Sequence, residues 1–246
     1  MLVTAVWRRL LAEFTGTALL VTVVVGSGIA AAQLSPGDVG LQLLENSVAT
    51  ALGLAVLILL FGPASGAHFN PVISAADWLL GRRLGTGLRA RDAIAYVAAQ
   101  TAGGIFGALL ANAMFDRRVV EIATKDRTTS GHFVGEVVAT AGLVALVFTL
   151  ARTQRAGLSA AAVGAYIGAA YWFTSSTSFA NPAATVGRMF SDSFAGIAPG
   201  SVPGFIAAQI VGALAGLALV VALYPDAART ADDAVIPHPH DFGSRS

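Results

Sequence analysis

Apolar residues are gathered in six long blocks along the chain, and short polar segments separate the blocks. The blocks cover residues 10–32, 41–61, 93–114, 133–151, 157–177 and 203–224. A helix needs about 20 apolar residues to cross a hydrocarbon core of roughly 30 Å, and each block has about that length. The pattern therefore predicts an all-α integral membrane protein with six transmembrane helices and no separate soluble domain.

The first block shares some features with a cleaved signal peptide, because Arg8 and Arg9 precede it and small residues follow it. It is long, however, it contains Glu13, and five further blocks come after it. We therefore interpret it as the first transmembrane helix.

Composition agrees with a membrane location. Hydrophobic residues make up 55% of the chain and charged residues 12%, and the mean hydropathy is +0.71. Soluble domains are less apolar than this. The chain has no cysteine, which excludes disulfides and thiolate metal sites. A net charge of +1 makes nucleic acid an unexpected partner.

Basic residues indicate the orientation, because loops rich in Lys and Arg tend to stay in the cytoplasm. If both termini are cytoplasmic, the internal set is Arg8, Arg9, Arg82, Arg83, Arg89, Arg91, Arg152, Arg155 and the arginines of the C-terminal tail. The loop at 115–132 also carries basic residues and opposes this orientation, but acidic residues are mixed into it. We expect both termini to be cytoplasmic.

The two halves of the chain resemble each other at matching places. "LAEFTGTALLV" (11–21) matches "VGEVVATAGLV" (134–144), "SGAHFNPV" (65–72) matches "TSFANPAA" (177–184), and "YVAAQTAGGIFGALLA" (96–111) matches "FIAAQIVGALAGLALV" (205–220). Each Asn-Pro also precedes the Gln of the last pair by 30 or 28 residues. Matches in the same order indicate an internal duplication.

Each repeat holds three full spans, so the second copy must enter the membrane from the opposite side. This predicts an inverted repeat, with repeat 1 at about 8–114 and repeat 2 at about 133–224. Together they form a single transmembrane domain within residues 1–246, followed by a flexible tail at 225–246. Segment 70–80, "NPVISAADWLL", is too short to span, so we expect two re-entrant half-helices, one in each repeat.

The two Asn-Pro pairs predict where these half-helices begin. Asn is a favoured N-cap, and Pro is favoured at the first helical position because its missing N–H has no partner there. The half-helices would thus start at Asn70-Pro71 and Asn181-Pro182. Their positive ends would meet at mid-membrane, which disfavours a cation and suits a neutral hydrogen-bonding solute in a water-filled passage.

These motifs resemble those of the aquaporin and glycerol-facilitator (major intrinsic protein) family. The residues that carry the resemblance are "AEFTGT", "SGAHFNPV", "FANPAA" and the two helices with "AAQ" followed by spaced glycines, over about residues 8–224. The resemblance implies six tilted helices and two half-helices, a pore in every subunit, a homotetramer, and passive permeation of water or small neutral solutes. It also implies a bacterial inner membrane.

Two positions depart from the family pattern. The resemblance places the pore centre at Asn70, Pro71, Val72, Asn181, Pro182 and Ala183. Val72 stands where the family usually has Ala, and Ala184 stands where the outer selectivity filter usually has Arg. Gapless counting from the two asparagines gives Thr50, Ala169 and Ser178 as the other filter residues. Such a filter would be wide and uncharged, as in a bacterial branch thought to pass glycerol or metalloid hydroxides such as arsenite.

Several further residues have a structural and a functional interpretation. Glu13 and Glu136 occupy equivalent places inside helices, where they would accept hydrogen bonds from the backbone before each half-helix, snorkel at a helix end, or couple protons. His68 is expected to be a hydrogen-bonded structural residue rather than a gate. Arg188 would line the outer vestibule without forming the constriction, or pair with Asp192. The hydroxyl run 174–178 would line the outer funnel or be ordinary loop.

Glycines at four-residue spacing predict close helix crossings. They are Gly103 and Gly107, Gly164 and Gly168, and Gly212 and Gly216.

The sequence shows no set of residues typical of an enzyme active site, no cofactor motif and no metal-ligand spacing, and "PHPH" at 237–240 is interpreted as part of the tail. The predicted function is a passive channel. The alternatives are an ion-coupled secondary transporter, which would need a carboxylate facing the lumen, and a non-conducting scaffold.

Overall fold

The structure, a computed structural model, describes residues 5–82 and 86–224. Eight α-helices are present in this part of the chain: α1 (Val6–Leu34), α2 (Val39–Ser65), α3 (Pro71–Gly81), α4 (Ala90–Met114), α5 (Ser130–Arg152), α6 (Ser159–Phe173), α7 (Pro182–Gly187) and α8 (Val202–Leu223). Short 3-10 turns precede α6 and α8 (Ala156–Leu158, Pro199–Ser201), and a third (Arg188–Phe190) follows α7.

Six of the described helical segments are long and apolar enough to cross a membrane. They coincide with the six predicted blocks, which confirms the all-α transmembrane fold. Large apolar side chains such as Leu52, Val56 and Leu59 are exposed on their outer faces. A soluble monomer rarely exposes so much apolar surface, whereas lipid accepts it.

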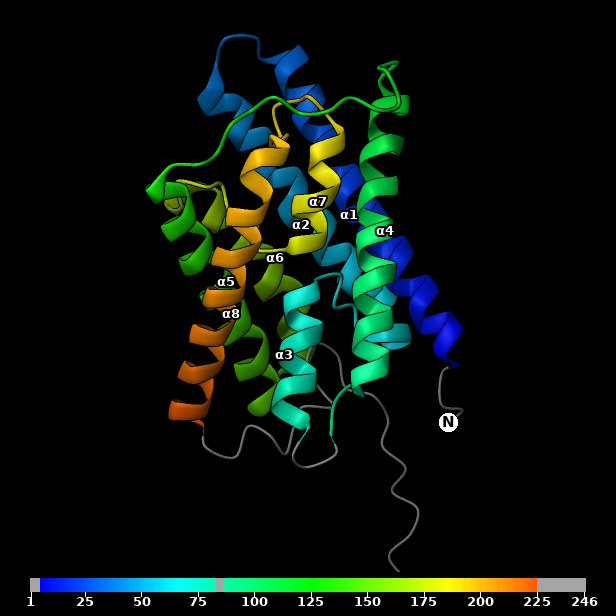
Figure 1. Ribbon diagram of the computed structural model, residues 1–246, viewed down its shortest axis with the longest axis vertical. Helices are drawn as coiled ribbons and strands as arrows, with labels where there is room; N and C mark the ends of the chain where they lie inside the picture. Colours follow the sequence, from blue (N-terminus) through cyan, green and yellow to red (C-terminus); the bar gives the residue numbers. More distant parts are fainter. Residues whose placement is uncertain (1–4, 83–85, 225–246) are drawn as a thin grey trace, which may run out of the picture.

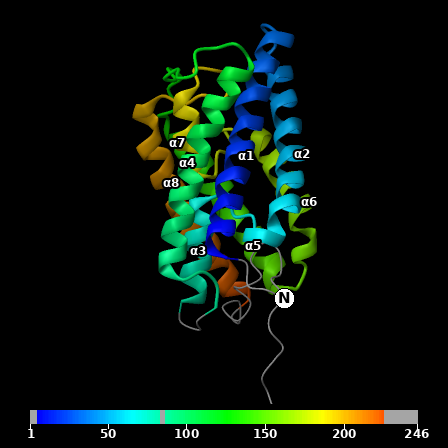
Figure 2. The same ribbon diagram turned by 90° about the vertical axis from the view of Figure 1, so that its right-hand side faces the viewer.

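The two short helices lie inside the bundle and come from opposite ends of it. In Figure 1, α3 occupies the lower half of the molecule and α7 the upper half, and the view of Figure 2 places them in the same way. Helix α1 begins and α8 ends at the lower end, so the described chain enters and leaves on one side (Figure 1). The elements α1 to α4 recur in the same order as α5 to α8.

Glycines allow the long helices to approach each other closely, as their spacing predicted. A Cβ atom on Gly107 would lie 2.1 Å from the carbonyl oxygen of Ala18 in α1. In the second half, a Cβ atom on Gly216 would lie 2.5 Å from the carbonyl oxygen of Ala141 in α5. At the other predicted glycines a Cβ atom would also come within 3 Å of a neighbouring helix: Gly103, Gly164, Gly168 and Gly212.

The fifth span is shorter than its apolar block. The sequence predicts a span near 157–177, but α6 ends at Phe173. Beyond it the backbone turns, and Thr177 and Ser178 have positive φ angles of 61° and 50°. The hydroxyl run is therefore a non-helical approach to α7. The predicted tail 225–246, including "PHPH", lies outside the described residues, as does Arg83.

Candidate functional site

Each half-helix begins at its Asn-Pro pair, as predicted. The side-chain oxygen of Asn70 accepts a hydrogen bond from Val72 N at 3.1 Å. The side-chain oxygen of Asn181 accepts from Ala183 N at 3.0 Å and from Ala184 N at 3.2 Å. These N-caps satisfy backbone donors that a helix start leaves without a partner, so both asparagines are held by their own half-helix.

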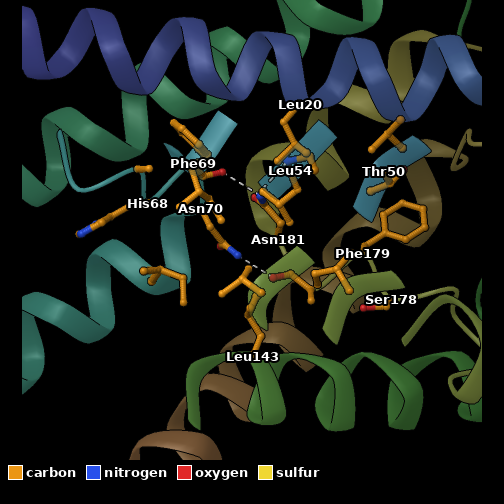
Figure 3. A pocket seen from close by; sticks show the side chains of 18 of the residues that line it. Leu20, Thr50, Leu54, His68, Phe69, Asn70, Leu143, Ser178, Phe179 and Asn181 are labelled. Carbon is orange, nitrogen blue, oxygen red and sulfur yellow. Dashed lines mark hydrogen bonds between the residues drawn. The ribbon is translucent and has the colours of Figure 1, made fainter. Parts of the chain in front are cut away.

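The two asparagines also join the half-helices to each other. Asn70 Nδ2 donates to the carbonyl oxygen of Ala180 at 2.7 Å, and Asn181 Nδ2 donates to that of Phe69 at 2.8 Å. Figure 3 shows this reciprocal pair, with both side chains on the wall of a cavity. Because an amide nitrogen carries two hydrogens, one N–H of each asparagine remains for another acceptor.

A buried carboxylate holds the backbone that leads into α3. Glu13 is fully buried in α1, and its two oxygens accept hydrogen bonds from His68 N at 3.0 Å and Phe69 N at 2.8 Å. The same carboxylate accepts from Ser65 Oγ and from Gln100 Nε2. These bonds stabilise a segment in which Ala67 and Phe69 have positive φ angles near 50°, a conformation that costs roughly 1–2 kcal/mol per residue.

Glu136 repeats this arrangement in front of α7. It is fully buried in α5 and accepts from Phe179 N and Ala180 N, both at 2.8 Å. Gln209 Nε2 donates to it at 2.6 Å. Of the three interpretations, backbone support describes both glutamates. They are withdrawn from the cavity wall and engaged with backbone donors, which disfavours the proton-coupling interpretation.

His68 has a structural contact within the first half. Its Nδ1 lies 3.1 Å from Ser74 Oγ, and its ring meets Tyr96 edge to face. Gln100 Nε2 also donates to Ser74 Oγ. The side chain nevertheless lies on the cavity wall, where Figure 3 shows it on the α3 side of Asn70.

The cavity between the two halves has a volume of about 70 Å³. A water molecule needs roughly 10–15 Å³ of such space, so the cavity holds several. Its polar groups come from the backbone before each half-helix, from the two asparagines and from hydroxyl-bearing side chains, and most of its apolar side chains come from α1, α2, α5 and α6. Thr50, Ser178 and Ala184, three of the predicted filter residues, line it.

The fourth predicted filter residue is wrong. Ala169 is exposed on the outer face of α6 and does not line the cavity. The α6 residues that do so are Val163, Ile167 and Tyr171, one per helical turn. Counting residues back from Asn181 without a gap gave the wrong position. The non-helical segment between α6 and α7 sets which α6 side chains face the cavity, and its path cannot be counted from the sequence. Nearly every position of this block is apolar, so the sequence held no signal that singles out Val163, Ile167 and Tyr171.

Tyr171 places a hydroxyl group beside Thr50. Their oxygens are 3.1 Å apart, which joins α6 to α2 across the wall. Ser178 Oγ is buried and makes no hydrogen bond in the described part of the chain. Phe179 packs in an apolar cluster and also lines the cavity.

The other residues predicted for the pore centre lie behind the asparagines. Pro71, Val72, Pro182 and Ala183 are buried but are not among the cavity-lining residues. Val72 packs in the main apolar core instead of beside the passage. In the first turn of each half-helix the third residue lines the cavity instead, Ile73 in α3 and Ala184 in α7, because successive residues of a helical turn point in different directions.

Arg188 does not pair with Asp192. Its Nε donates to the carbonyl oxygen of Ala195 at 2.5 Å, and its guanidinium carbon lies 3.3 Å from the centre of the Phe179 ring. Asp192 accepts instead from Thr124 N and Oγ1. Arg188 is 3% exposed and lines the same cavity as Thr50 and Ser178, so it is deeper than an outer-vestibule residue.

The loop between α4 and α5 crosses the end of the bundle from which α7 enters, as Figure 1 shows. Its backbone pairs with the segment after α7, with Ala123 N donating to Met189 O and Ala198 N to Lys125 O. Burial and the charges of Arg127 and Arg188 lower the pKa of Lys125 to about 8. Three basic side chains, Lys125, Arg127 and Arg188, thus lie near one another at this end of the bundle.

No group of three or more residues able to hold a metal ion is found among the residues that the structure describes. The polar groups on the cavity wall are amides, hydroxyls, one imidazole and one guanidinium.

Known proteins with similar sequences and folds agree with this geometry. A profile described as "Major intrinsic protein" matches residues 2–178. Aquaglyceroporin AqpS of Rhizobium meliloti is 48% identical over 213 residues, which cover 87% of this chain and 88% of that protein. The glycerol uptake facilitator protein of Pseudomonas aeruginosa is 32% identical over 127 residues, which cover 52% of this chain and 43% of that protein.

The X-ray structure of the aquaglyceroporin from Plasmodium falciparum has the same fold, with a TM-score of 0.66 at 18% identity. The match covers 91% of this chain and 99% of that one. With the family profile extending over more than half of the chain, the chain belongs to the major intrinsic protein family of membrane channels, which are not enzymes.

Proposed function

We propose that this protein is a passive channel for water and small uncharged solutes, of the size of glycerol or of metalloid hydroxides such as arsenite. The observation that carries the proposal is the meeting of Asn70 and Asn181 on the wall of the cavity, each with one amide hydrogen left for a solute oxygen. The similarity to an aquaglyceroporin supports the same solute class.

The lining of the cavity suits a molecule that has both polar and apolar parts. Amide and hydroxyl groups line it together with apolar side chains such as Leu20, Leu143 and Ile167. A polyol can hydrogen-bond the polar groups while its carbon backbone contacts the apolar side chains. An ion would lose its hydration shell without gaining a countercharge, because the carboxylates of Glu13 and Glu136 are bound to backbone N–H groups.

The filter of this channel would lack the arginine that the family pattern expects immediately after the second motif. Ala184 occupies that position and lines the cavity with Thr50 and Ser178. The revised fourth member is Tyr171. Three hydroxyl groups and a methyl group would make this region accessible to solutes larger than water.

Further features of the proposal concern assembly and location. We expect one channel domain per chain, a homotetramer, and a bacterial inner membrane with both termini in the cytoplasm. The bacterial relatives support the location, and the common end of α1 and α8 supports two termini on the same side of the membrane. The positive-inside rule favours the end that carries Arg8, Arg9, Arg89 and Arg152 as the cytoplasmic one.

Light scattering on proteoliposomes tests the function. The purified chain should raise the flux of water and of neutral polyols above that of empty vesicles, without a gradient of any ion.

The variant Ala184→Arg should lower polyol flux on the order of tenfold, because it adds a bulky cation to the cavity wall. Gly200→Arg adds the same side chain outside the cavity and should leave flux unchanged. Absence of any flux through the native chain would refute the proposal.

A further inference from the structure

A buried arginine lines the same cavity as position 184, which supplies only a methyl group. Arg188 is four residues beyond Ala184, in the 3-10 turn that follows α7. Side chains of helical residues lean toward the N-terminus, so a long side chain one turn further on, about 6 Å along the axis, points back toward Ala184. Both residues line the same cavity.

The side chain of Arg188 is fixed in place. Phe179 supports one face of the guanidinium group, and the carbonyl oxygen of Ala195 accepts from Nε. Stacking on an aromatic ring and a single carbonyl partner orient the planar group. In the part of the chain that the structure describes, its two Nη groups have no hydrogen-bond or ion-pair partner. Their donors therefore remain available to the cavity.

A second buried arginine nearby, Arg127, differs from Arg188 in the partners of its guanidinium group. Arg127 also lies beside Phe179, with its guanidinium carbon 5.0 Å from the ring centre. Its Nε donates to Gly196 O at 3.1 Å and its Nη1 to Ser176 O at 3.3 Å, and the residue does not line the cavity. Arg127 thus stabilises the surrounding loops, whereas Arg188 presents its charge to the passage.

We propose that Arg188 is the charged filter group of this channel and takes the place of the missing arginine at position 184. Its positive charge excludes cations, and its Nη donors bind the oxygens of neutral solutes together with Thr50, Tyr171 and Ser178. This inference rests on the proposed channel function. It corrects the expectation of an uncharged filter and gives the constriction a specificity-determining residue.

The test compares Arg188→Gln, Arg188→Lys and Arg188→Ala in proteoliposomes, with an entrapped pH-sensitive dye for proton leak and light scattering for glycerol and larger polyols. Arg188→Gln keeps a donor for Ala195 but loses the charge, so proton and cation leak should rise on the order of tenfold. Arg188→Lys should keep cations out. Arg188→Ala should also raise the flux of larger polyols relative to glycerol.

The double variant Ala184→Arg with Arg188→Ala provides the decisive comparison. It returns one guanidinium group to the cavity and should restore cation exclusion. Arg118→Ala, an exposed residue on the loop between α4 and α5, is the matched control and should behave like the native chain.

Folded Arg188→Gln and Arg188→Ala channels that keep native leak and native polyol selectivity would overturn the inference while leaving the channel function intact. If Arg188→Ala does not fold, the proton and cation leak of Arg188→Gln compared with that of Arg188→Lys still decides the role of the charge. If the native chain carries no solute, the proposed function fails and this inference falls with it.

Discussion

At the scale of single residues, two buried carboxylates hold the backbone that leads into each half-helix. Glu13 and Glu136 each accept two backbone N–H bonds from the residues that precede a half-helix asparagine. These bonds hold backbone in the left-handed region, where Ala180 has φ 47°. Without the carboxylates, buried N–H groups would lose their partners in a low-dielectric interior, which is costly.

Glu136→Gln therefore should destabilise the folded chain by about 1–3 kcal/mol, because an amide offers one acceptor oxygen where the carboxylate offers two. A lower midpoint of thermal unfolding in detergent would register the loss. Glu121→Gln is the matched control, since Glu121 pairs with Arg117 on the partly exposed outer loop and such pairs contribute at most about 1 kcal/mol. Equal midpoints for the two variants would contradict the assigned role.

At the scale of elements, close contacts position α7 against α4. A Cβ atom on Gly104 would lie 2.5 Å from Ala183 O, and one on Gly187 would lie 2.3 Å from Gly104 O. Ala184 and Arg188, each one residue further along than Ala183 and Gly187, line the cavity. The width of the passage is thus linked to a helix contact in which only glycine fits.

Gly104→Ala should push α7 toward the cavity and lower solute flux several-fold, with a stability loss of about 1–3 kcal/mol from overpacking. Flux measured per folded channel separates the two effects. Gly200→Ala is the control, because no heavy atom lies within 4 Å of a Cβ atom built there. Native flux through Gly104→Ala channels would show that α7 does not depend on this contact.

At the scale of the whole molecule, the orientation can be read from one side chain. Lys125 is the single lysine in the chain. It is exposed in the loop between α4 and α5, at the end opposite to the start of α1. With both termini cytoplasmic, this loop faces the outside.

A membrane-impermeant amine reagent applied to intact cells at pH 7.5 should label Lys125. Its pKa of about 8 leaves about a quarter of the amine neutral and reactive at that pH, against about 0.1% for an ordinary lysine. Lys125→Arg removes the target and should abolish this labelling. If labelling appears only after the cells are opened, the loop faces the cytoplasm and the orientation is opposite to the one proposed.

Local patterns in the sequence were sufficient for the spans and the half-helix starts. Apolar block length, the Asn-Pro cap and the paired glutamates each act through neighbouring residues or through a repeat that can be seen in the letters. They predicted α1 to α8 with shifts of a few residues at their ends, and they predicted that Asn70 and Asn181 meet. The family resemblance added Thr50, Ser178 and Ala184, which line the same cavity.

Only the tertiary structure decided which residues complete the proposed filter. Ala169 and Tyr171 are two positions apart, and the path of the non-helical segment from α6 to α7 selects Tyr171. Arg188 reaches the cavity because Phe179 and Ala195, from segments on either side of α7, hold its guanidinium group there. Side-chain direction at such a point is set by packing between distant segments, which no periodicity in the sequence records.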